Sequence, residues 1–198
     1  MIIVGITGGI GTGKGLATQF FRSRGAAIVD ADEIARELAQ PGSRMVADIA
    51  VEFGRCALRQ DGSLDRRKLA GMVFGDPGAV AKLNAITHPP IKAEVERRIE
   101  SLVREESAGV VCLVAPLLLE AGLGETVDRV LVMTADEGAR VRRVMARDGI
   151  SEAEVRERMA AQMSPAEQVE QANWVVDTTG GRDEVCRRLD AIWAELNE

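Results

Sequence analysis

The chain has 198 residues, enough for one globular domain with an elaborated insertion. Hydrophobic residues make up 46% of it and charged residues 28%, which is the composition of an ordinary globular protein and excludes a disordered or fibrous chain. The net charge of −6 argues against a dedicated binder of nucleic acid or anionic membranes, so any anion that the protein binds must be held by a local positive site.

The chain opens with a short apolar, β-branched run over residues 1–6, which is typical of a buried parallel strand. A glycine-rich stretch follows, and a helix is predicted from about Lys14 to Arg24, where Gly25 ends it. Residues 27–30 predict a second strand that ends on carboxylates. This order of strand, loop, helix and strand is typical of α/β proteins.

The middle of the chain, from about residue 31 to residue 108, has a mostly helical pattern. Asp76–Pro77 predicts a helix N-terminus, with the aspartate as cap and the proline in the first turn. Pro89–Pro90 predicts another helix start, and a long apolar stripe follows it. We therefore expect a helical lobe in this part of the chain.

Further strands are predicted at residues 110–114, 130–133 and 174–176, with helices between and after them. Strands that alternate with helices indicate a parallel sheet, whose ligands bind beyond the carboxyl ends of the strands. The longest apolar stretch, residues 110–119, is too short to cross a bilayer, and the N-terminus has no basic leader. We therefore expect a cytoplasmic location.

The strongest signal is the segment Gly8–Lys14, which matches the G-x-x-x-x-G-K of a Walker A motif and lies between a strand and a helix. Glycines let the backbone N–H groups point at phosphate, the helix dipole adds positive potential, and Lys14 brings a mobile charge. The structural alternative is a glycine-rich turn with a surface lysine. The residues that we expect to bind nucleotide are Gly9, Ile10, Gly11, Thr12, Gly13, Lys14, Gly15 and Leu16.

One position departs from the motif, which normally ends in a Ser or Thr whose hydroxyl binds Mg²⁺. Gly15 offers no side-chain oxygen, and Thr18 lies about a turn further along the helix. The third strand is followed by Ala115 rather than by an aspartate. No metal ligand is therefore certain: water can fill the vacant position, and a carboxylate near the metal must come from elsewhere, with Asp32 as the candidate. We therefore still expect nucleotide binding, but the missing hydroxyl could lower the catalytic activity.

Two carboxylates, Asp30 and Asp32, stand at the end of the second strand, which lies next to the phosphate loop in this topology. If a phosphoryl group is transferred to a hydroxyl here, a nearby group must accept the proton of that hydroxyl. Either aspartate could instead cap the helix that follows. The residues alone leave both roles open.

A basic helix is predicted further along, because three arginines recur at the spacing i, i+3 and i+7 and so share one face. These are Arg140, Arg143 and Arg147, and the face expected to pack carries Val141, Val144 and Met145. A basic face near an active site can clamp phosphates as part of a closing lid. The alternative is a solvated helix face. Gly149 and the capping box Ser151–Glu154 suggest a hinge and a second helix after it.

In this order and spacing, these segments resemble the dephospho-CoA kinase family over nearly the whole chain. The resemblance rests on residues 5–14, 28–36, 62–69, 83–84, 88–89, 115–120 and 143–148. It implies ATP-dependent phosphorylation of the ribose 3′-hydroxyl of dephospho-CoA, the last step of coenzyme A synthesis, with ATP and Mg²⁺ as nucleotide and metal.

The resemblance also implies roles for single residues. Asp32 becomes the expected base, with Lys14 and Arg143 as the other catalytic residues. Arg143 and Arg147 are expected to bind the phosphates of ATP. The residues implied to contact the acceptor are Asp32, Arg36, Arg67, His88 and Leu117, although His88, the one histidine, could equally be structural. Gln162, Asn173 and residues 177–180 fall where this fold holds adenine.

We therefore predict an α/β fold: a P-loop NTPase core of about five parallel strands in a three-layer α/β/α sandwich, with a helical substrate lobe and a short helical lid. The core spans residues 1–32, 109–139 and 164–198, the lobe about 33–108 and the lid about 140–163. The expected partner is the small molecule dephospho-CoA, with no nucleic acid or membrane, and the expected state is a monomer or small homo-oligomer. Two alternatives stay open: another small-molecule P-loop kinase, such as an adenylate-kinase-like enzyme, and a nucleotide-binding module weakened at Gly15.

Overall fold

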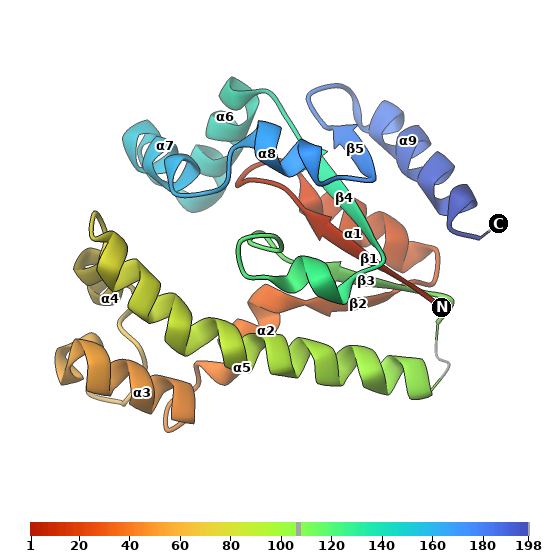
Figure 1. Ribbon diagram of the computed structural model, residues 1–198. Coiled ribbons are helices and arrows are strands. Elements are labelled where there is room, and N and C mark those ends of the chain that lie inside the picture. Colours follow the sequence, from red (N-terminus) through yellow and green to blue (C-terminus); the bar gives the residue numbers. More distant parts are fainter. Residues whose placement is uncertain (106–107, 198) are drawn as a thin grey trace. The chain divides into compact units, whose positions relative to one another are not determined.

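The structure, a computed structural model, describes residues 1–105 and 108–197 (Figure 1). The chain divides into two compact units, one formed by residues 1–30 and 99–198 and the other by residues 31–98. We call them the sheet unit and the helical unit. Residues 106 and 107, which the predicted lobe includes, and residue 198, which the predicted core includes, lie outside the described residues.

The sheet unit is built on five parallel strands in the order β2-β3-β1-β4-β5. Ile6 of β1 pairs with Val114 on one side and with Leu131 on the other, which fixes the register of the three central strands. The predicted parallel sheet of about five strands is therefore confirmed. The strands are β1 (Ile2–Thr7), β2 (Ala27–Asp30), β3 (Val110–Val114), β4 (Arg129–Thr134) and β5 (Trp174–Asp177).

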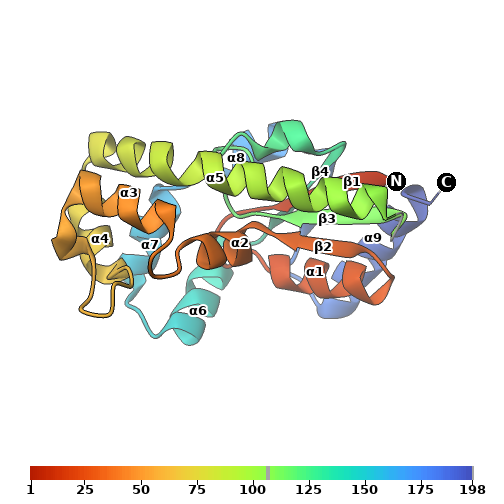
Figure 2. The ribbon, with the colours of Figure 1, turned by 90° about the horizontal axis from the view of Figure 1, so that it is seen from below.

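Helices cover both faces of this sheet, as Figure 2 shows with the sheet nearly edge-on. Helices α1 (Lys14–Ser23) and α9 (Arg182–Glu195) lie on one side, and α8 (Pro165–Glu170) with the short helix η2 (Leu123–Thr126) lies on the other. All five residues of β3 are buried, as expected for a strand covered on both faces. Phe21 and Leu189 from the two helices join the strand residues in one hydrophobic core. The predicted three-layer sandwich is confirmed.

Two further helices of the sheet unit, α6 (Glu137–Asp148) and α7 (Glu152–Ala160), form a smaller cluster. Gly149 ends α6 in the left-handed conformation at φ 66°, and Ser151 with Glu154 forms the predicted capping box of α7. The valines of the cluster pack on Ile10 of the glycine-rich loop. Met145 does not belong to this packed face, because 37% of it is exposed, so that prediction was wrong. The buried residues are Val141, Val144 and Val155.

The helical unit has its own core and contains three helices, one 3-10 turn and most of a fourth helix. Met45, Ile49 and Leu69 are buried in that core. Arg98 donates hydrogen bonds to Glu94 and Glu37, which ties the two helices that carry them. The elements are α2 (Ala31–Leu38), α3 (Arg44–Phe53), η1 (Arg55–Ala57), α4 (Arg66–Val73) and α5 (Pro77–Arg104).

Helix α5 confirms one sequence prediction and corrects another. It begins at Pro77, and Asp76 Oδ1 caps it by accepting from two backbone N–H groups over 2.9 and 3.0 Å. It does not begin again at Pro89–Pro90, which lie inside its 28 residues. Each proline lacks an N–H donor, so the two prolines remove backbone hydrogen bonds from one turn of the helix. Packing of the preceding turn stabilises the helix there. Leu83 and Ile86 supply this packing against the core of the helical unit.

Candidate active site

The glycine-rich loop between β1 and α1 is the centre of the site, and its shape requires glycine. Gly8 has φ 137°, and a side chain there would overlap the carbonyl oxygen of Met133 at the end of β4. Gly11 has φ 80°, and a Cβ atom there would lie 2.7 Å from the carbonyl oxygen of Arg140 in α6. The loop is therefore seated between β4 and α6. A glycine-rich turn exposed to solvent would not need these contacts. They therefore disfavour the structural alternative to a phosphate loop, a glycine-rich turn with a surface lysine.

Lys14 begins α1 and folds back over the loop. Its Nζ donates to the carbonyl oxygens of Gly8 over 2.6 Å and of Gly9 over 3.1 Å. Thr12 is buried, and its hydroxyl donates to the same Gly9 carbonyl over 2.8 Å. The ammonium charge is thus held across the mouth of the loop, where it can bind phosphate.

Thr178, which follows β5, connects three segments of the sheet unit. Its hydroxyl donates to the carbonyl oxygen of Thr12 over 2.8 Å, and its backbone N–H donates to the carbonyl oxygen of Thr134 over 2.8 Å. It is 4% exposed. The parallel order of β1, β4 and β5 places all three carboxyl ends at one edge, which explains the contact. Thr178 therefore holds the loop to the ends of β4 and β5.

Arg143 of α6 reaches the same place from the other side. Its Nη2 donates to the carbonyl oxygen of Thr178 over 2.6 Å, and its Nη1 donates to the hydroxyl of Thr178 over 2.9 Å and to the carbonyl oxygen of Gly11 over 3.2 Å. The structure thus brings Arg143 to the phosphate loop. Arg147, by contrast, is bound to Asp148 over 2.7 and 2.9 Å, and its side chain is 63% exposed. The two arginines do not converge in this structure.

Arg140 is not part of a solvated face. It is 6% exposed, and its Nε donates to the carbonyl oxygen of Ile10 over 2.9 Å. Burial lowers the pKa of Arg140 below its ordinary value, but a guanidinium stays charged at neutral pH. Gln162, which follows α7, accepts the backbone N–H of Ile10 with its Oε1 over 2.8 Å. Both ends of the predicted lid segment therefore contact the loop.

A cavity of about 330 Å³ opens beside the second half of the loop. Arg143 and Thr178 lie on one wall, and the start of α1 lies on another. Its volume falls in the range that holds small ligands in proteins. Four of the residues predicted to bind nucleotide line it: Gly13, Gly15, Leu16 and Arg143.

The glycine-rich loop offers no side-chain oxygen at the position where a Walker A motif has its Ser or Thr. Gly15 is exposed, and a Cβ atom added to it would have nothing within 4 Å. The hydroxyl of Thr18 donates to the carbonyl oxygen of Lys14 over 3.0 Å, so it is committed to the helix backbone. Within residues 1–105 and 108–197, no group of three His, Cys, Asp or Glu side chains is placed to hold a metal ion.

Comparisons with known proteins agree with this geometry. A family model described as dephospho-CoA kinase matches residues 2–184. The dephospho-CoA kinase of Geobacter sulfurreducens is 41% identical over 195 residues, which cover 98% of each chain. The chain belongs to the dephospho-CoA kinase family.

Two solved structures extend the likeness to three dimensions. A Thermus thermophilus protein superposes with a TM-score of 0.79 at 37% identity and covers 98% of this chain and 97% of its own. Dephospho-CoA kinase from Campylobacter jejuni superposes with a TM-score of 0.68 at 23% identity over 98% and 96% of the two chains, a likeness that supports the fold. The dephospho-CoA kinase match covers both units.

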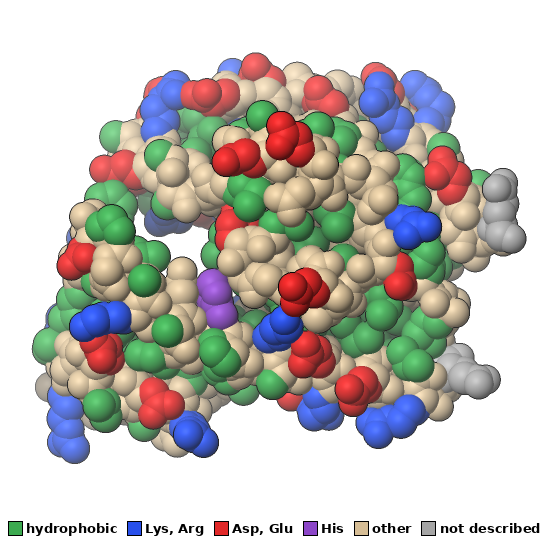
Figure 3. All heavy atoms as spheres, viewed as in Figure 1, with side chains coloured by type: hydrophobic (Ala, Val, Ile, Leu, Met, Phe, Trp, Pro, Cys, Tyr) green, Lys and Arg blue, Asp and Glu red, His purple; other side chains and the backbone are tan. Residues whose placement is uncertain are grey.

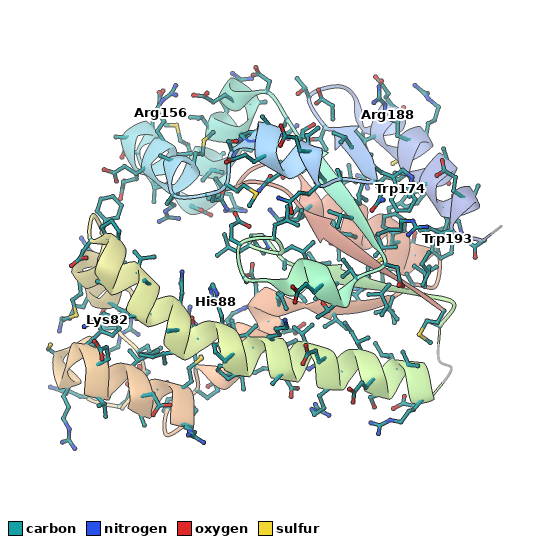
Figure 4. All side chains as sticks on the ribbon, in the orientation of Figure 1. Lys82, His88, Arg156, Trp174, Arg188 and Trp193 are labelled. Carbon is teal, nitrogen blue, oxygen red and sulfur yellow. The ribbon has the colours of Figure 1, made fainter. Side chains whose placement is uncertain are left out.

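The remaining residues that the family resemblance singled out fall mainly in the helical unit. Asp32 lies in the first turn of α2 and is exposed, two residues after β2 ends. Arg36, on the next turn, is exposed and donates from Nε to the carbonyl oxygen of Asp32 over 3.0 Å. Arg67 is exposed near the start of α4. His88 projects from α5 in Figure 4, and burial lowers its pKa.

Leu117 is the one acceptor residue of the resemblance that belongs to the sheet unit, where it is 37% exposed after β3. Other contacts of the phosphate loop could not be predicted from the sequence. Thr178 and Gln162 were noted only as lying near adenine, whereas they bind the loop itself. Gln168 is 2% exposed, and its Nε2 has no hydrogen-bond partner among the described residues. Its signal is burial of an amide, which a linear sequence does not display.

Proposed function

We propose that this protein transfers the terminal phosphoryl group of ATP to the ribose 3′-hydroxyl of dephospho-CoA, which gives coenzyme A. The observation that carries the proposal is the family match over residues 2–184, which spans the phosphate loop and the whole helical unit. A match to the loop alone would support only nucleotide binding.

The sheet unit supplies the nucleotide side of the proposal. The loop backbone and Lys14 cradle the phosphates, and the cavity beside Arg143 and Thr178 takes the adenosine end. Arg143 carries its charge to the loop, where charge develops as the phosphoryl group leaves ADP. Gly9 to Leu16 are the residues that would contact ATP, and Arg147 would join them only by leaving Asp148.

The helical unit supplies the acceptor side. Asp32 is the proposed base, because an exposed carboxylate can accept the proton of the 3′-hydroxyl as the new bond forms. Arg36 and Arg67 are exposed cations that suit the diphosphate of dephospho-CoA. His88 of this unit and Leu117 of the sheet unit are the other residues proposed to contact the acceptor.

Magnesium in this proposal accompanies ATP rather than being ligated by the protein at the Walker A position. Asp32 would hold the ion through water, and phosphate oxygens and further water would supply its other ligands. Its chemistry would be to neutralise phosphate charge.

Partners and location follow the same proposal. On the face in Figure 3, Lys and Arg side chains lie among Asp and Glu side chains and gather in no single basic patch, which supports a small-molecule partner over nucleic acid. Within the part of the chain that the structure describes, no helix is both long and apolar enough to span a bilayer. A cytoplasmic location and a monomeric or small oligomeric state stay predictions.

The deciding experiment incubates the purified protein with ATP, Mg²⁺ and dephospho-CoA and measures coenzyme A by mass. AMP and shikimate as alternative acceptors separate this activity from that of other small-molecule kinases. Coenzyme A formed in preference to the other products supports the proposal. Tight ATP binding with no product from any acceptor would contradict it and favour a nucleotide-binding module.

A further inference from the structure

Glu120 lies on a tight turn that follows β3 in the sheet unit. The backbone N–H of Leu123 closes this turn by donating to the carbonyl oxygen of Leu118 over 2.9 Å. Leu118 is fully buried, and a Cβ atom added to Gly5 of β1 would lie 2.6 Å from its Cδ2. The turn is therefore packed against the central strand of the sheet, and this packing gives Glu120 a rigid support.

The carboxylate of Glu120 binds a segment that lies 43 residues further along the chain. Its Oε1 accepts the backbone N–H of Met163 over 3.0 Å, where the chain passes from α7 to α8. Met163 directly follows Gln162, whose Oε1 accepts the backbone N–H of Ile10 over 2.8 Å. The two hydrogen bonds therefore act in series: the turn after β3 holds this segment, and the segment holds the phosphate loop.

Ile10 is the residue at which the phosphate loop is held by its surroundings. Its N–H group is bound by Gln162, and its carbonyl oxygen accepts from Nε of Arg140 over 2.9 Å. Its side chain packs against the buried valines of α6 and α7. A displacement of Gln162 would therefore be transmitted directly to the backbone of the loop.

The second carboxylate oxygen of Glu120 shows that the bond to Met163 stands alone. Oε2 is buried and accepts no hydrogen bond from any described residue. An unpaired buried oxygen costs free energy, so the residue is poorly suited to stabilise the fold. What distinguishes Glu120 from an apolar residue here is its one bond to the backbone of Met163.

We propose that Glu120 is a positioning residue for phosphoryl transfer, which sets the phosphate loop through Met163 and Gln162. The proposal rests on the proposed use of ATP. Binding of ATP depends mainly on Lys14 and on the start of α1, which Glu120 does not contact. Transfer depends in addition on the alignment of the reacting groups, so a displaced loop should lower kcat more than it raises the KM for ATP.

Two variants separate the hydrogen bond of Glu120 from its charge. Glu120→Gln keeps an oxygen that can accept the N–H of Met163 but removes the charge, whereas Glu120→Asp keeps the charge on a shorter side chain. The kcat for coenzyme A formation should fall by about tenfold in Glu120→Asp and stay within about twofold in Glu120→Gln. The KM for ATP should stay within about threefold in both variants. Glu170→Asp makes the same change at an exposed position of α8 and should alter neither constant.

The reverse order, with Glu120→Asp near the wild type and Glu120→Gln impaired, would overturn the proposal. It would show that the charge of this residue matters and not its bond to Met163.

Hydrogen exchange of single backbone amides, followed by NMR with no nucleotide or acceptor added, tests the connection itself. The N–H of Ile10 should exchange at least about tenfold faster in Glu120→Asp than in the wild type. The N–H of Thr178, bound to the carbonyl oxygen of Thr134, should be unchanged, whereas general destabilisation would accelerate both amides. Adding Glu120→Asp to Gln162→Ala should accelerate Ile10 by less than about twofold, because the two residues act in series. Additive effects would contradict the connection.

The exchange measurement separates this proposal from the proposed reaction. A chain that shows the coupled exchange but forms no coenzyme A would support the connection from Glu120 to the loop and contradict only the proposed reaction. A chain that forms coenzyme A, and in which Ile10 exchanges equally fast in the wild type and in Glu120→Asp, would overturn the role of Glu120 and leave the proposed reaction standing.

Discussion

Arg143 and Thr178 are joined by two hydrogen bonds, from Nη2 to the carbonyl oxygen over 2.6 Å and from Nη1 to the hydroxyl over 2.9 Å. The fork of a guanidinium fits this pair of acceptors, which the single point charge of a lysine cannot do. Because the hydroxyl of Thr178 also donates to Thr12, the arginine, the threonine and the loop form one connected network. Removal of its central hydroxyl should therefore affect both stability and nucleotide binding.

Thr178→Val tests that network. The valine keeps the shape of threonine but leaves the carbonyl oxygen of Thr12 without its donor, which should cost about 1–3 kcal/mol in the free energy of unfolding. ATP binding should weaken as well, because the loop and Arg143 lose a shared partner. Urea unfolding and calorimetric titration measure the two effects. Thr178→Ser keeps the hydroxyl and should restore both; a serine variant as impaired as the valine variant would contradict the network.

Asp32→Asn tests the proposed base. The amide cannot accept the proton, so the rate of coenzyme A formation should fall by roughly 10² or more while ATP affinity stays near that of the wild type. Glu33→Gln neutralises the neighbouring exposed carboxylate on α2 and should leave the rate within about twofold. Equal losses in both variants would show that the charge of this turn, and not one base, matters.

Gly15→Ser tests the departure from the Walker A motif. Space is open at this position, and serine suits a helix better than glycine, so the free energy of unfolding should rise by about 0.5 kcal/mol. The new hydroxyl should strengthen ATP binding with Mg²⁺ by at least about threefold and leave binding in EDTA unchanged. Equal gains with and without the metal would mean that the serine acts on the phosphate and not on the ion.

His88 gives a pH dependence whose sign follows from its environment. Burial lowers its pKa below the ordinary 6.5, so the unfolded chain binds the proton more readily. Its favourable contribution to stability is present above pH 6.5 and is lost as the pH falls through that value towards the folded pKa. His88 is the one histidine of the chain, so its C2 proton can be assigned directly. That proton should titrate below pH 6.5 in a proton NMR spectrum of the folded protein.

His88→Gln should flatten the fall of the melting temperature between about pH 7 and pH 5 if this residue is responsible. A folded-state pKa above the ordinary value would reverse the sign. That result would indicate a nearby anion and not burial as the dominant influence.

The sequence predicted the elements whose signals are local. Five strands, the Asp76 cap and the loop of Gly8–Lys14 could be read because each depends on adjacent residues. Pro89–Pro90 was misread because packing along α5 overrides a local preference to begin a helix there. Local rules describe what a segment favours in isolation, and tertiary packing decides the rest.

The contacts of the loop could not be predicted in the same way. Arg140 and Arg147 share a helix face by spacing, yet seven residues separate them by about 10 Å along the axis. The glycine-rich loop covers Arg140 but not Arg147. Arg140 is therefore buried, whereas Arg147 pairs with Asp148. Thr178 and Gln162 bind residues that lie 166 and 152 positions away, and no short pattern encodes such a pair. The placement of Asp32 as base remains a prediction.

The bonds that Arg140, Gln162 and Thr178 make to the loop have a thermodynamic consequence. Each fixes a backbone carbonyl or N–H group of the loop through a contact made within the protein. The entropy lost in ordering those residues is therefore spent when the chain folds and not when ATP arrives. A flexible glycine loop of the same sequence would lose more entropy when it binds nucleotide, and its association with nucleotide would be slower. This one should behave as a rigid receptor whose occupancy follows nucleotide concentration without a preceding conformational step.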